Sequence, residues 1–304
     1  MAKIIIGIHG LANKPPRETL DKWWRQSITE GLKINCKINP EFNFRMVYWA
    51  DLLYFNQLHR NHNFSFDALY NNEPYGPAKK GALKRYKDSR IDDWRAGALD
   101  IVGTGLDKLK KTFGMDRLAD GILGRVLRDL AFYYDDTRSI GNRKGKPELA
   151  RKVLRSELKN ALIEEKAHTI MLIGHSMGSI IAYDVLHGLS SGNQDVKVSH
   201  FVTIGSPLGL PHVKGKIIQE HKGKTPRTPA IVTKSWVNYA DRKDPVALDV
   251  HLDDDYEANE KRIPVKDDII LNDYSIKKKS NHHKSYGYLR TPELSEHVKD
   301  FLGL

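Results

Sequence analysis

The sequence has little of the features that mark disulfide-rich, exported or membrane-spanning proteins. It contains one cysteine, Cys36, in 304 residues, which excludes an intrachain disulfide and favours a reducing compartment. The first residues lack the basic start and apolar core of a secretory signal. No apolar run approaches the roughly 18 residues that a membrane-spanning helix needs. We therefore expect a soluble, cytoplasmic protein.

Signatures of metal and nucleic-acid binding are also missing. A single cysteine cannot build a thiolate site, and the 13 histidines form no His-Glu-x-x-His run, so we expect no metal and no cofactor. The formal charge of +11 comes from lysines and arginines spread among many acidic residues, without an aromatic RNA-binding motif. No nucleic-acid partner is expected. The positive charge could instead favour peripheral contact with an anionic membrane. The sequence does not indicate the oligomeric state.

Apolar runs alternate with amphipathic periods along the chain. Runs that are apolar throughout are typical of parallel strands covered by helices on both faces. This pattern predicts an α/β fold with a mostly parallel central sheet, in a single domain over residues 1–304. Strands are predicted at 3–8, 44–49, 169–173, 198–204, 234–239 and 269–276, helices at 16–34, 148–165, 176–189 and 292–302, and a basic loop at 212–228.

A large insertion interrupts this alternation. Residues 51–145 separate two predicted elements that would ordinarily be joined by about two to six residues. Apolar residues recur at helical spacing in 99–113 and again in 115–130, so the insertion is expected to be mainly helical. Two interpretations stay open: a helical pair that stabilises the domain, or a lid over the active site formed by residues 85–134.

A Gly-x-Ser-x-Gly pentapeptide, residues 174–178, stands directly between the apolar run at 169–173 and a helical run. The pentapeptide alone is weak evidence, but between a strand and a helix it predicts a tight turn with Ser176 at its tip. The glycines leave room for the neighbouring strand and helix. The turn would expose the hydroxyl of Ser176 at the carboxyl edge of the sheet, where ligand crevices form.

This Gly-His-Ser-Met-Gly elbow resembles that of the α/β-hydrolase superfamily, in its serine esterase and lipase branch. The resemblance covers nearly the whole chain apart from the insertion, and it implies Ser176 as nucleophile. It also implies an oxyanion hole built from the backbone N–H groups of Met177 and Leu11. Leu11 follows His9-Gly10 at the end of the first strand, a pair that otherwise reads as an ordinary strand-ending turn.

The same resemblance implies an acid and then a histidine later in the chain, because serine needs a base that a carboxylate holds in the right tautomer. Asp244, in an Asp-Pro-Val-Ala segment, is the favoured acid, and Asp241 is the alternative. His283 is the favoured base, in a His-x-x-Tyr setting, and its neighbour His282 is the alternative.

The pocket is expected to include His9, Gly10, Pro207 and Leu208. Together these features predict a serine hydrolase of carboxylic esters, with a small-molecule or lipid ester as substrate. The insertion and the basic charge incline the prediction toward long acyl chains. Acyl transfer or amide cleavage on the same triad is one alternative, and a non-catalytic protein that binds membranes or partners is another.

Overall fold

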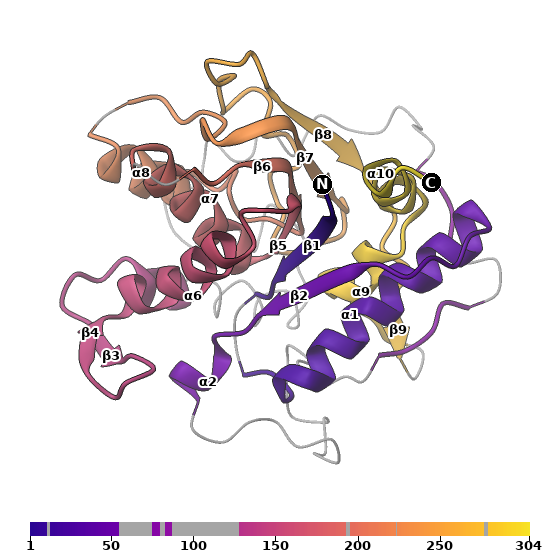
Figure 1. Cartoon of the computed structure of the whole chain (residues 1–304), viewed down its shortest axis with the longest axis horizontal. Coiled ribbons are helices and arrows are strands. Elements are labelled where there is room, and N and C mark those ends of the chain that lie inside the picture. The colour runs from indigo at the N-terminus through magenta and orange to yellow at the C-terminus, as the bar shows by residue number, and fades with distance from the viewer. Residues whose placement is uncertain are drawn as a thin grey trace, which may run out of the picture.

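The computed structural model describes residues 1–10, 13–54, 75–79, 83–86, 128–192, 195–222, 224–276 and 279–304. Its centre is a six-stranded sheet in the order β2-β1-β5-β6-β7-β8, and every neighbouring pair is parallel (Figure 1). The predicted α/β fold with a parallel central sheet is confirmed. The strands are β1 (Lys3–Ile8), β2 (Asn43–Val47), β5 (Thr169–His175), β6 (Val198–Ile204), β7 (Val232–Ala240) and β8 (Val265–Ile269).

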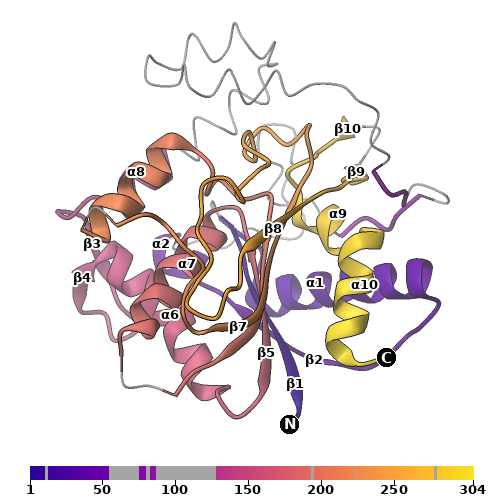
Figure 2. The ribbon, with the colours of Figure 1, turned by 90° about the horizontal axis from the view of Figure 1, so that it is seen from above.

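Helices cover both faces of this sheet, as Figure 2 shows. On one face lie α6 (Ala150–Glu164), α7 (Met177–Ser190) and α8 (Pro211–Glu220). On the other lie α1 (Arg17–Gly31), which continues into the π-helical turn η1 (Leu32–Cys36), α9 (Ser285–Leu289) and α10 (Pro292–Leu302). The smaller elements are α2 (Ala50–Leu53) and two short antiparallel pairs, β3 (Ser139–Gly141) with β4 (Pro147–Leu149) and β9 (Ser275–Ile276) with β10 (Lys279–Ser280).

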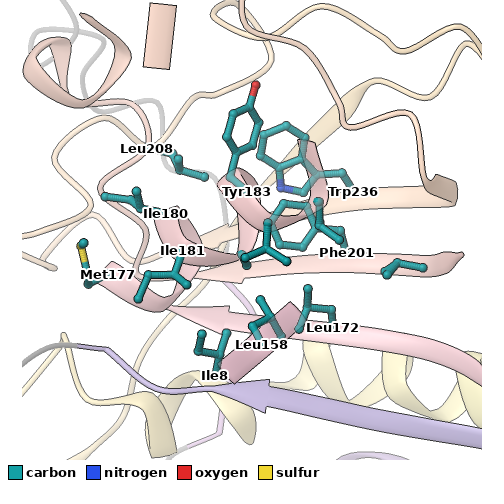
Figure 3. Packing of buried hydrophobic residues seen from close by; sticks show 14 of the residues in the cluster. Ile8, Leu158, Leu172, Met177, Ile180, Ile181, Tyr183, Phe201, Leu208 and Trp236 are labelled. Atoms are coloured by element: carbon teal, nitrogen blue, oxygen red, sulfur yellow. The ribbon is translucent and has the colours of Figure 1, made fainter. Parts of the chain in front are cut away.

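The apolar core on the α7 side explains why this helix is hydrophobic around most of its circumference. Side chains of α7 pack against the sheet below and against Leu208 and Trp236 from later segments (Figure 3). Trp236 is fully buried, with its ring 5.2 Å from that of Phe201. Burying a large apolar side chain stabilises a fold by about 1.5–3 kcal/mol. The helix that begins at the elbow is thereby held rigidly on the sheet.

Two of the predicted elements are wrong. The last strand of the sheet is β8 and not 269–276. The sequence of β8, Val-Lys-Asp-Asp-Ile, carries the charges of an exposed sheet edge, so it lacks the apolar run from which a strand was predicted. The segment expected to be a basic loop at 212–228 begins with α8. Pro211 occupies the first turn of α8, where a missing N–H costs nothing, and Val213 and Ile217 form its buried stripe.

The predicted helical insertion, including the possible lid at 85–134, lies largely outside the described residues. Its described parts are tied to the domain. Arg290, 1% exposed, donates to the carbonyl of Gly76 at 2.6 Å and pairs with Glu30 of α1. Near the other end, residues 128–133 are helical, and the Tyr133 hydroxyl donates to Asp184 of α7 at 2.7 Å. Among the described residues, no helix is both long and apolar enough to span a membrane.

The strand order places a topological switch point between β1 and β5. The chain runs from β1 to β2 on one side and then returns to β5 on the other side of β1. Loops leaving β1 and β5 therefore diverge, and a crevice for ligands opens at their carboxyl ends. His9-Gly10 follows β1 and Ser176 follows β5, so the two segments flank this point.

Candidate active site

Ser176 sits at the tip of the turn between β5 and α7, with φ +54° and ψ −128°. A positive φ in a residue other than glycine costs about 1–3 kcal/mol and persists only where the surroundings impose it. The flanking glycines show how: a Cβ at Gly178 would lie 2.5 Å from the carbonyl oxygen of Ile8, and one at Gly174 would lie 2.8 Å from Cα of Ser179. The elbow therefore requires glycine at both positions, as the sequence predicts.

A chain of hydrogen bonds links Ser176 to the favoured histidine and acid. The Nε2 atom of His283 lies 3.0 Å from Oγ of Ser176, and its Nδ1 atom lies 2.9 Å from both carboxylate oxygens of Asp244. Because a carboxylate only accepts, Nδ1 carries the proton and Nε2 is free to accept from the serine hydroxyl. The three residues arrive from the elbow, the loop after β7 and the loop before α9.

Buried donors hold the carboxylate of Asp244, which is 1% exposed. The Tyr288 hydroxyl of α9 donates to its Oδ2 at 2.7 Å, and the backbone N–H of Val246 donates to its Oδ1 at 2.8 Å. Below it lies Gly205, at φ +53°, where a Cβ would stand 2.7 Å from Oδ2. Burial, followed by the nearby carboxylates of Asp244 and Asp241, raises the pKa of Tyr288 well above its ordinary value, so its hydroxyl remains a donor.

The alternative acid and base form a separate pair. Asp241 accepts through Oδ2 from Nδ1 of His282 at 3.2 Å and from the backbone N–H of Asn272 at 2.7 Å. Its Oδ1 accepts from the backbone N–H of Lys243 at 2.7 Å. The structure therefore pairs Asp244 with His283 and Asp241 with His282, and it brings only the first pair to Ser176. The adjacent histidines could not be told apart from sequence.

His9 of the predicted pocket is locked by backbone groups. Its Nδ1 donates to the carbonyl of Gly10 at 2.7 Å, its Nε2 accepts from the N–H of Trp49 at 3.2 Å, and its ring stacks on that of Trp49. Burial, with a smaller effect of Lys14, lowers the pKa of His9 to about 3. Both ring nitrogens are used, so this side chain fixes the turn at Gly10. A Cβ at Gly10 would lie 2.7 Å from Cβ of Ser176.

The remaining predicted site residues divide into three groups. Met177 is the first residue of α7, and the first N–H groups of a helix lack intrahelical acceptors. Pro207 and Leu208 are buried beyond the end of β6, and Leu208 packs into the apolar core beside α7 (Figure 3). Leu11 lies outside the described residues.

The elbow residue before the serine, His175, lies beside His283, with ring centroids 4.8 Å apart, and its Nε2 donates to the carbonyl oxygen of His283 at 2.8 Å. Burial, followed by the charge of His283, lowers the pKa of His175 well below its ordinary value. A neutral ring therefore supports the backbone of His283.

Comparison with known proteins adds a family match at the elbow. A model of the lecithin:cholesterol acyltransferase family matches residues 143–219, a segment that contains Ser176. No curated protein matches the chain. Among solved structures, the chain is similar to a lipase-esterase related protein from Clostridium acetobutylicum ATCC 824, with 8% identity, coverage of 98% of this chain and 94% of that one, and a TM-score of 0.31. This similarity is too low to support any conclusion beyond those drawn from the strand order.

The fold therefore follows from the parallel sheet, the elbow between β5 and α7 and the family match over that elbow. The chain has an α/β-hydrolase fold. In this fold the positive end of α7 faces the turn that carries Ser176, where it favours negative charge.

A group of three residues with metal-ligand side chains includes none of Ser176, His283 and Asp244. Within the described ranges, His251, Asp253 and Asp267 bring ligand atoms within 4.8 Å of one another. Asp267, however, already accepts the backbone N–H groups of Leu252 and Asp253 at 2.7 and 2.9 Å. These bonds explain the cluster as an anchor for the loop on β8.

Proposed function

We propose that this α/β-hydrolase cleaves carboxylic esters through an acyl-enzyme on Ser176, with His283 as general base and Asp244 as the group that orients it. The observation that carries this proposal is the unbroken hydrogen-bonded chain from Oγ of Ser176 through His283 to Asp244, at 3.0 and 2.9 Å. A base must lie within hydrogen-bond reach of the proton it removes, and His283 does.

The reaction follows from this geometry. Oγ of Ser176 attacks the ester carbonyl carbon while Nε2 of His283 takes its proton, and Asp244 stabilises the resulting imidazolium. His283 then gives the proton to the departing alkoxide, which leaves as the alcohol. Water attacks the acyl-enzyme next, His283 accepts a proton from it, and the acid is released as Ser176 regains its hydrogen. Backbone N–H groups of Met177 and Leu11 are proposed to bind the oxyanion.

The test is hydrolysis of p-nitrophenyl esters of graded acyl length by the wild type, Ser176→Ala and Ser199→Ala. Ser199 is a matched control: it is a buried serine near the start of β6, where its Oγ donates to the carbonyl of Ile170. Ser176→Ala should lose activity by at least about a thousandfold while Ser199→Ala keeps it. Equal rates in all three proteins would refute the proposal. The optimum acyl length tests the expected preference for long chains.

Acyl transfer is a second candidate on the same triad, and the match to the lecithin:cholesterol acyltransferase family over the elbow favours it. An acyltransferase would give the acyl group of the intermediate to an alcohol in preference to water. Adding a series of alcohols to the ester assay and measuring acid against new ester distinguishes the two. If the acid is the sole product even at high alcohol concentration, acyl transfer is excluded and hydrolysis is the reaction.

A further inference from the structure

The loop that carries His283 lies between β10 and α9, outside any regular hydrogen-bonded ladder. Three consecutive carbonyl oxygens in it nevertheless accept from buried side chains. Nδ2 of Asn272 donates to the carbonyl of His282 at 2.8 Å and to that of Lys284 at 2.9 Å. Nε2 of His175 donates to the carbonyl between them, that of His283 itself, at 2.8 Å. One amide therefore binds the carbonyls of the residues before and after His283.

Asn272 is itself buried and held by two further hydrogen bonds. Its backbone N–H donates to Asp241 at 2.7 Å, its Oδ1 accepts from the N–H of Tyr274 at 3.1 Å, and it is 3% exposed. Since Oδ1 faces a backbone donor, the NH2 group must point at the two loop carbonyls. Helix α9 also packs against Asn272, because a Cβ at Gly287 would stand 1.6 Å from Oδ1.

We propose that Asn272 is a positioning residue for the catalytic base, an inference that rests on the proposed role of His283. The imidazole is held at one end by Asp244 and must reach Ser176 with the other, so its position depends on where the loop backbone lies. A displacement of about 1 Å in a reacting group can cost about a hundredfold in rate. No sequence motif marks Asn272, because its contribution is made through backbone carbonyls.

A second buried asparagine provides a matched control. Nδ2 of Asn259 also donates to two backbone carbonyls, those of Pro229 at 3.2 Å and Val232 at 3.1 Å, and its Oδ1 also accepts backbone N–H groups. It is 4% exposed. Val232 begins β7 and the acid loop follows the end of β7, about 26 Å away at about 3.3 Å per residue. Asn259→Asp thus removes the same kind of bonds far from the triad.

The experiment compares Asn272→Asp, Asn272→Ala and Asn259→Asp by ester hydrolysis, by the rate of labelling with a fluorophosphonate and by thermal unfolding. Both Asn272 variants should lose at least about tenfold in kcat and in labelling rate, with KM within about twofold of the wild type. The uncharged alanine separates the lost donors from the added charge. Asn259→Asp should unfold at a lower temperature and still label at the wild-type rate.

Folded Asn272 variants that label as fast as the wild type would overturn the inference. So would an equal loss in Asn259→Asp, which would reduce the effect to general destabilisation. If neither Asn272 variant folds, Asn272→Ser gives the milder change and should still label more slowly than the wild type. Failure of the proposed function appears separately, as a wild type that is not labelled or a Ser176→Ala protein that is.

Discussion

The choice between the two acids yields the sharpest prediction. Both oxygens of Asp244 lie 2.9 Å from Nδ1 of His283, so the NH2 group of Asp244→Asn lies against that nitrogen in either orientation. Such a donor favours the tautomer with the proton on Nε2, which then cannot accept from Ser176. This substitution in a Ser-His-Asp triad costs about 10⁴ in kcat. At about 1.36 kcal/mol per tenfold, that is about 5.4 kcal/mol of activation free energy.

Asp241→Asn is the matched variant, because Asp241 is equally buried but bonds to His282. Its amide must leave the N–H of Lys243 or of Asn272 without an acceptor, which costs about 1–3 kcal/mol of stability. Activity per folded molecule should stay within about tenfold of the wild type. Steady-state kinetics with urea unfolding of both variants tests this. A folded Asp241→Asn as inactive as Asp244→Asn would refute the assignment.

Three further predictions concern the groups around the triad. Tyr288→Phe removes the hydroxyl that donates to the buried carboxylate of Asp244, so stability should fall by about 1–3 kcal/mol and kcat should fall with it; urea unfolding and steady-state kinetics check this. Gly205→Ala sets a Cβ 2.7 Å from Asp244 at a positive φ, so both activity and melting temperature should fall. The pKa of His9 is lowered to about 3, so this side chain binds more protons in the unfolded protein than in the folded one. The free energy of unfolding should therefore fall by about 1.4 kcal/mol per pH unit as the pH drops from about 6.5 toward 3. Replacing this residue, as in His9→Gln, should weaken that pH dependence in urea unfolding at pH 5 and 7.5, and an unchanged dependence would contradict the prediction.

The sequence predicts the turn at Ser176 well because the elbow is a local feature. An apolar run, a pentapeptide with two glycines and a helical run lie within about 20 residues, and the steric reason for each glycine acts within that turn. The proposed acid and base have no such local pattern. Asp241 and Asp244 lie in one turn, His282 and His283 are neighbours, and only their pairing across the loops distinguishes the members.

The errors in the predicted fold have a related cause. Apolar content decides whether a segment reads as a buried strand, and β8 is an edge strand whose Lys266, Asp267 and Asp268 hide it. The adjacent run of Ile269, Ile270 and Leu271 attracts the strand prediction, although β8 ends at Ile269 and the rest of the run lies in the loop that leads to Asn272. Charge on α8 concealed a helix in the same way.

The polar groups that support the triad have no local pattern at all. The elbow is shaped by glycines, but the loops with Asp244 and His283 leave the sheet and depend on Tyr288, Asn272 and His175 for their positions. Each of these residues is buried and bonds mainly to residues distant in the sequence. Neither a local sequence pattern nor burial therefore distinguishes them from the apolar residues around them. Substitutions there should lower activity more than stability, whereas substitutions in the apolar core should do the reverse. A scan that measures labelling rate and unfolding free energy together separates the two classes, and coincident losses in both would show that the triad is held by the core alone.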